Sequence, residues 1–102
     1  MTPVQLCRCL GDDLRLTLVA LIRARQDVCV CELTELLGAP QSTVSRHLSQ
    51  LRECGIVVAR REGTWMHYRL APDMPPWALE CIDRLVDAVD APTQNWPLSR
   101  AC

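Results

Sequence analysis

The sequence predicts a mainly α-helical domain with one β-hairpin, arranged as a winged helix-turn-helix. Two observations support this fold class. Two short amphipathic segments in the middle of the chain are separated only by Gly38-Ala39-Pro40, and the segment 56–70 behind them has strand character with a turn at Glu62-Gly63. Of the 102 residues, 49% are hydrophobic and 23% are charged, which is typical of a folded domain.

Helical spacing of apolar residues predicts the individual elements. We expect helices over 3–10, over 14–25 behind a cap at Asp12 or Asp13, over 33–37, over 41–54 and over 78–89, with a short strand at 28–30. Gly38 and Pro40 end the third helix, Gly55 ends the fourth, and a proline-rich segment precedes the last. Residues 1–90 therefore form one domain, and residues 91–102, which lack periodicity, form a flexible tail.

The hairpin should have one apolar and one polar face. With a two-residue turn, Val57 and Ala59 share a face with Met66 and Tyr68. The opposite face then carries Val58, Arg60, Trp65, His67 and Arg69. A one-residue slip in register would exchange the two faces.

Positive charge is concentrated in the middle of the chain, although the net charge is −1. Residues 41–70 contain five arginines and two acidic residues, whereas 71–102 contain two arginines and five acidic residues. Every basic residue is an arginine, a side chain suited to bidentate contacts with phosphate and guanine. This local excess, on the predicted helix-turn-helix, favours binding to double-stranded DNA.

In this arrangement the second helix of the pair enters the major groove with its N-terminal residues leading. The candidate DNA-contacting residues are Gln41, Ser42, Thr43, Ser45, Arg46 and His47 on the helix, with Arg60 and Arg61 on the hairpin. The alternative is a winged helix that contacts another protein, in which the arginines form a solvated face. The coincidence of charge and motif favours DNA.

Cys29 and Cys31 lie directly in front of the helix-turn-helix and suggest a site for a soft, thiophilic ion. Residues i and i+2 point about 200° apart on a regular helix but share a face on an extended segment. The two thiols can therefore chelate one ion only at an irregular point, such as the predicted strand-to-helix junction. The alternative is a pair of buried packing cysteines.

Three stretches resemble the ArsR/SmtB family of small dimeric metal-sensing repressors. They are VCVCEL at 28–33, VSRHLSQLRECGIV at 44–57 and REGTWMHYRL at 61–70, within a similarity that runs from about 6 to 89. The first stretch is most similar to the arsenic-responsive branch. The resemblance implies a homodimer joined through the first and last helices, with Trp77 in the dimer core, that binds operator DNA without a cofactor and is released by As(III) or Sb(III).

The chain departs from the family pattern in three places. Arsenic sensors often have a further cysteine where this chain has Thr34, so a third sulfur must come from Cys7, Cys9, Cys54 or a small-molecule thiol. Pro40-Gln41-Ser42 differs from the usual start of the reading helix, and we expect the cap to shift to Ser42. Asp83 and Asp87 have no histidine beside them, which disfavours the family's zinc site on the last helix.

The sequence is also compatible with other functions. The same fold could sense Cd(II), Pb(II) or an oxidant, or the protein could be a thiol-rich metalloid carrier or docking module without DNA function. The sequence has no glycine-rich phosphate loop and no histidine beside a candidate nucleophile, so we do not expect an enzyme. We expect a cytoplasmic protein with no membrane partner, because no signal peptide or apolar span is visible. The sequence assigns no role to Cys81 or Cys102.

Overall fold

The computed structural model describes residues 1–89 and has five helices and three strands in that part of the chain. In chain order the elements are α1 (Pro3–Leu10), α2 (Asp13–Arg25), β1 (Val28–Cys29), α3 (Val30–Leu37), α4 (Gln41–Glu53), β2 (Val57–Glu62), β3 (Trp65–Leu70) and α5 (Pro76–Asp87). The winged helix-turn-helix prediction is confirmed. The expected tail at 91–102, with Cys102, lies outside the described residues.

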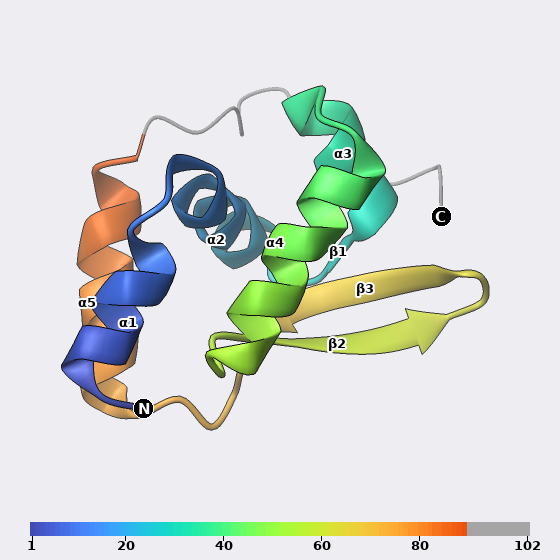
Figure 1. Cartoon of the computed structure of the whole chain (residues 1–102). Coiled ribbons are helices and arrows are strands. Elements are labelled where there is room, and N and C mark those ends of the chain that lie inside the picture. Colours follow the sequence, from blue (N-terminus) through green and yellow to red (C-terminus); the bar gives the residue numbers. More distant parts are fainter. Residues whose placement is uncertain (90–102) are drawn as a thin grey trace.

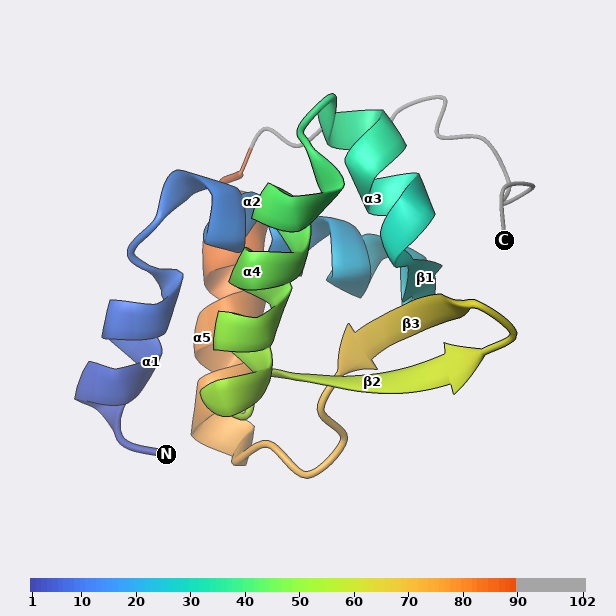
Figure 2. The ribbon, with the colours of Figure 1, turned by 45° about the vertical axis from the view of Figure 1, so that its right-hand side comes forward.

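The helices surround one aliphatic core, and the hairpin projects from it. Figure 1 shows α4 across the middle of the molecule, with α1 and α5 on one side and α3 and the strands on the other. Figure 2 shows α1 and α5 running beside each other. Fully buried leucine, isoleucine and valine side chains from α2, α3, α4 and α5 fill the centre.

Local signals in the sequence explain where the helices begin and end. The side chain of Asp12 accepts the Arg15 N–H at 3.0 Å and caps α2, as expected. Gln26 ends that helix in a left-handed conformation (φ 72°), and its N–H donates to the Ile22 carbonyl. Gly38 ends α3 with φ 64°, a conformation that glycine adopts without steric cost. The short connection to α4 follows from this cap.

The cap expected at Ser42 is wrong. Helix α4 begins at Gln41, and Pro40 is its N-cap, without any side-chain hydrogen bond to the first turn. Proline holds the extended conformation required at this position and lacks an N–H that would need a partner. The Ser42 side chain is therefore not used as a cap and lies in the first turn, exposed to solvent.

The three strands form one antiparallel sheet in the order β1-β3-β2. Glu62 pairs with Trp65, so the turn is Gly63-Thr64, one residue later than expected. This shift changes each cross-strand partner by two residues and leaves the faces as predicted: Ala59 lies opposite Tyr68, and Arg60 lies opposite His67. Strand β1 ends one residue earlier than expected, because Val30 already belongs to α3. None of the described helices is long and apolar enough to cross a bilayer.

Candidate thiol site and nucleic-acid interface

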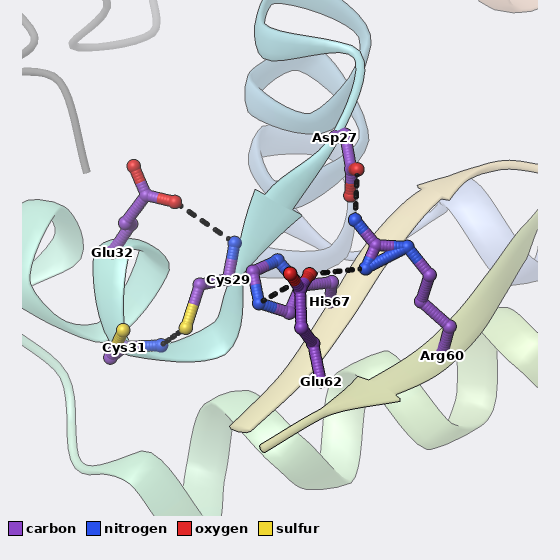
Figure 3. A network of polar contacts seen from close by, with 7 residues as sticks. All are labelled: Asp27, Cys29, Cys31, Glu32, Arg60, Glu62 and His67. Atoms are coloured by element: carbon purple, nitrogen blue, oxygen red, sulfur yellow. Dashed lines mark hydrogen bonds and ion pairs between the residues drawn. The ribbon is translucent and has the colours of Figure 1, made fainter. Parts of the chain in front are cut away.

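Cys29 and Cys31 lie on either side of the point where strand β1 becomes helix α3. Cys29 is the last residue of β1 and the N-cap of α3, with an extended backbone (φ −76°, ψ 145°), and it is fully buried. Cys31 is half-buried in the first turn, and its N–H donates to the Cys29 Sγ at 3.3 Å (Figure 3). Both cysteines are disulfide-bonded in the structure, so a thiophilic ion could bind only after reduction. The junction is the irregular geometry that the spacing requires.

Glu32 completes this junction from the third residue of α3. The side chain is 8% exposed, and its Oε1 accepts the Cys29 N–H at 3.0 Å. Its Oε2 accepts a hydrogen bond from Arg25 Nη2 of α2, also at 3.0 Å. The arrangement is a capping box in which a cysteine occupies the position usually held by serine or threonine. The sequence signal for this cap is Cys29-x-x-Glu32, which differs from the usual pattern only in having cysteine at the first position.

A row of side chains connects Cys29 to the wing across the sheet. Cys29 lies opposite His67 of β3, and His67 lies opposite Arg60 of β2, so the three side chains share one face. Glu62 joins the row, with its Oε2 at 3.7 Å from His67 Nε2 and 2.8 Å from Arg60 Nη1. Arg60 also donates to Asp27, two residues before Cys29, at 2.5 Å (Figure 3). Arg60 of the wing is thus hydrogen-bonded to the segment directly before Cys29.

The structure does not bring the candidate third ligands to Cys29 and Cys31. Among residues 1–89 no three histidine, cysteine, aspartate or glutamate side chains form a group that could hold a metal ion. Cys7 is exposed on α1, whereas the buried Cys9 lies beside Cys54 at the end of α4. A third sulfur for the Cys29-Cys31 pair would therefore come from another molecule or from outside the described residues.

Helix α4 separates an apolar face from a polar one. Val44, Leu48 and Leu51 are fully buried, whereas Gln41, Ser42 and Arg46 are exposed and Thr43 and Ser45 are half-buried. An exposed N-terminal turn with hydroxyl, amide and guanidinium groups is suited to phosphates and base edges. Five of the six residues predicted on this helix are thus available to a ligand outside the chain.

His47 faces the protein instead. Its side chain is 13% exposed, and Nδ1 is buried without a hydrogen-bond partner at 3.9 Å from Asp12 Oδ2. Asp12 caps α2, so this contact sets α4 against the start of α2. The N–H of Arg15 and, to a smaller extent, the guanidinium of Arg15 and the His47 ring lower the pKa of Asp12 below 3.8.

Arg60 and Arg61, the two arginines of the wing, differ in the residues that they contact. Arg61 is exposed, and its partner across the hairpin is Met66, on the face opposite the Arg60 row. Arg60 is engaged with two carboxylates, Asp27 and Glu62, at 47% side-chain exposure. Phosphate would have to compete with these carboxylates for Arg60, whereas no carboxylate within residues 1–89 is paired with Arg61.

An apolar groove runs between α1 and α5. Its volume is about 650 Å³, and its walls come from both helices, including Leu6, Leu10, Trp77 and Leu85. Val4 (62% exposed), Trp77 (36%) and Leu85 (43%) are large apolar side chains left in contact with solvent. Exposed apolar patches of this kind mark interaction surfaces.

Comparison with known proteins places the chain in a family. The model of the bacterial regulatory protein arsR family matches residues 12–58. The chain is 44% identical over 96 residues to the arsenic resistance transcriptional regulator ArsR1 of Pseudomonas putida, covering 94% of this chain and 72% of the relative. It is 43% identical over 83 residues to the arsenical resistance operon repressor of Escherichia coli, covering 81% and 71%.

Solved structures agree with these matches. The AntR antimony-specific transcriptional repressor is 30% identical, with a TM-score of 0.68 over 79% of this chain and 70% of that one. The homodimeric winged helix-turn-helix DNA-binding domain Mb0332 of Mycobacterium bovis is also 30% identical, with a TM-score of 0.65 over 82% and 70%. AntR is a transcriptional repressor, and Mb0332 is described as a possible ArsR-family transcriptional regulator. The chain belongs to the arsR family of bacterial regulatory proteins, which includes the arsenic-resistance regulators to which it is 43–44% identical.

Proposed function

We propose that this protein is a metalloid-responsive repressor that binds operator DNA as a homodimer and is released when As(III) or Sb(III) binds Cys29 and Cys31. The observation that carries the proposal is the position of the two cysteines at the β1–α3 junction, where α3 begins the helix-turn-helix. The names of the arsenic-resistance relatives and of the antimony-specific repressor support the choice of inducer.

The DNA-binding part rests on the exposed N-terminal turn of α4. Gln41, Ser42, Ser45 and Arg46 are the residues we expect to contact the major groove, with Arg61 on flanking phosphate. His47 and Arg60, which contact the protein's own carboxylates, are assigned to holding the reading surface in place.

The homodimer is supported by the groove between α1 and α5. A second copy of this surface would cover Val4, Trp77 and Leu85, which are exposed in the single chain. A two-fold interface is self-complementary, so the groove of one chain would receive the same helices of the other. Two reading helices would then face two half-sites of a palindromic operator.

Release would begin at the helix cap. The Cys29 sulfur accepts the Cys31 N–H, and this bond is weakened once the sulfur donates its electron pair to an inducer. The first turn of α3 must then rearrange, and α3 packs directly against α4. A coupling of about 1–3 kcal/mol is enough to change DNA affinity about 5–150-fold.

The wing offers a second path for the same signal. A displaced β1 would move Asp27 and the backbone partner of His67, and both contact the network around Arg60. Both paths begin at Cys29, so the binding of one inducer ion would move α4 through α3 and would also move the β2–β3 wing.

The test is fluorescence anisotropy of labelled upstream DNA with the protein reduced by a phosphine, which unlike a dithiol does not chelate As(III). We expect salt-sensitive binding that As(III) reverses near one equivalent per chain. Cys29→Ser and Cys31→Ser should bind DNA as the parent does and fail to release, whereas Cys81→Ser, an equally small change on α5 in the wall of the proposed dimer groove and away from the junction, should release normally.

Three outcomes would contradict the proposal in different ways. Normal release by both serine variants would place the inducer site elsewhere. DNA binding that responds only to Cd(II), Pb(II) or peroxide would keep the repressor and change the signal. Absence of DNA binding at low salt would remove the repressor function and favour a thiol-rich carrier.

A further inference from the structure

A second pair of cysteines lies on the other side of the molecule from the β1–α3 junction. Cys9, near the end of α1, is 4% exposed, and Cys54, the C-cap of α4, is half-buried. The Cys9 thiol donates to the Gln50 carbonyl oxygen at 3.8 Å, and Cys9 and Cys54 line the same small cavity, where the Cys54 thiol helps to raise the pKa of Cys9. The fold thus brings two thiols from distant parts of the sequence to the same small cavity.

The pair is reachable from solvent through a small opening. Cys9 and Cys54 line a surface cavity of about 250 Å³ together with Arg15, Gln50 and Glu53. A cavity of this size admits water and small oxidants. It lies on the side of α1 that faces α4, whereas Leu6, Cys7 and Leu10 of the same helix face the α5 groove. A dimer formed through that groove would leave the cavity open.

The two helices are held in place around the thiols. Arg15 of α2 donates from Nε to the Cys9 carbonyl at 2.6 Å and from Nη1 to Gln50 Oε1 at 2.9 Å. This one guanidinium therefore fixes the end of α1 against the last turns of α4. The nearness of the two cysteines therefore follows from how the ends of α1 and α4 are held together.

We propose that Cys9 and Cys54 form a peroxide-sensitive redox site, separate from the Cys29-Cys31 pair, that closes to a disulfide between α1 and α4. In the first step the Cys54 thiolate attacks a peroxide oxygen, the O–O bond breaks, and Cys54 sulfenic acid and hydroxide form. In the second step the Cys9 sulfur attacks the sulfenic sulfur; the S–O bond breaks, and the proton of Cys9 leaves with the hydroxyl as water. Two thiols are oxidised and one peroxide is reduced.

The different surroundings of the two thiols set the order of these steps. Burial, and then the hydrogen bond with Cys54, raise the pKa of Cys9 to about 12, against a smaller opposing effect of Arg15. Cys9 therefore stays protonated and inert towards peroxide, while the more exposed Cys54 meets the oxidant first. An accessible thiol with a buried partner beside it is the usual arrangement of a sensing and a resolving cysteine.

The Cys9–Cys54 disulfide would join α1 and α4, two helices to which we assign different functions. Helix α1 belongs to the proposed dimer surface, and α4 is the proposed reading helix. A disulfide between their ends fixes the reading helix relative to the dimer, whatever the state of the β1–α3 junction. The redox site does not depend on the metalloid proposal, because neither Cys29 nor Cys31 takes part in it.

The test uses a parent with Cys29→Ser and Cys31→Ser, treated with one equivalent of hydrogen peroxide, blocked with a maleimide and digested with trypsin. Cleavage after Arg8 separates Cys7 from Cys9, so the expected product is peptide 9–15 joined to peptide 53–60, lighter by two hydrogens than the two reduced peptides. Adding Cys54→Ser should abolish this product, and adding Cys81→Ser should leave it unchanged.

Adding Cys9→Ala to the parent gives the complementary result. Without its partner, Cys54 should stop at sulfenic acid, which dimedone traps as an adduct on peptide 53–60. Circular dichroism checks that each variant is folded. Peroxide-treated parent that carries the dimedone adduct but no 9–54 link, or that links Cys7 or Cys81 as readily, would overturn the proposal.

Discussion

Replacing Glu32 by alanine tests whether the β1–α3 junction depends on its buried carboxylate. The change removes the acceptor of the Cys29 N–H and of Arg25 Nη2, both at 3.0 Å. A hydrogen bond to a charged group contributes about 1.5–3 kcal/mol, and an acidic residue in the first turn of a helix adds about 0.3–1 kcal/mol. Because the Arg25 side chain is 20% exposed and regains some water, we expect a total loss of about 2–4 kcal/mol.

Urea unfolding of the reduced protein measures this loss, with all variants at one protein concentration because a dimer's stability depends on it. Glu35→Ala is the matched control: it removes the same charge from an exposed position on the same helix and should change stability by less than about 0.5 kcal/mol. Glu32→Gln keeps an acceptor oxygen and should fall between the two. A loss below about 1 kcal/mol for Glu32→Ala would refute the capping argument.

Three further predictions concern single side chains. Arg46→Ala should weaken DNA binding by about 1–3 kcal/mol in anisotropy titrations, whereas Arg23→Ala, exposed on α2, should not; equal losses would remove Arg46 from the interface. Asp12→Ala should lower the free energy of unfolding by about 1 kcal/mol at neutral pH, measured by thermal unfolding, because the ionised Asp12 carboxylate caps α2. The lowered pKa of Asp12 makes this contribution available above about pH 4, so the difference between variant and parent should vanish in stronger acid. Because the pKa of Cys9 is raised to about 12 in the folded protein, this thiol stabilises the fold fully below pH 9.0, and the stabilisation is lost as the pH rises towards about 12. Cys9→Ala should therefore make the urea midpoint fall less steeply with alkaline pH. An unchanged slope would contradict a raised pKa at Cys9.

The sequence predicted the features that depend on local pattern. The β-prone residues 28–30 before a helical pattern predicted a strand-to-helix junction at Cys29 and Cys31, and the structure has one there. The hairpin faces were correct although the turn was misplaced by one residue, because the shift preserved which residues alternate together. The cap of α2 was narrowed by residue type to Asp12 or Asp13, and the structure assigns it to Asp12.

The missing features depend on distant contacts or on an unusual residue. Nothing in the local pattern pairs Cys29 with His67, so the link from the thiols to Arg60 could not be foreseen. The nearness of Cys9 and Cys54 arises from the packing of the end of α1 against the end of α4. Glu32 was missed because cysteine is an uncommon capping residue, and His47 was assigned to DNA by position although its ring turns inward.

The capping role of Cys29 would give the proposed metalloid switch a threshold. A sulfur that is fully buried and already accepts a hydrogen bond is not available to every ligand that prefers thiols. An incoming ion has to compensate for a lost cap, about 1 kcal/mol, and for opening the first turn of α3 before any net binding appears. Weak thiol ligands that are abundant in a cell would remain below this threshold, whereas ions that form the strongest bonds to sulfur would exceed it. Selectivity would then come from the stability of a helix end rather than from the shape of a cavity.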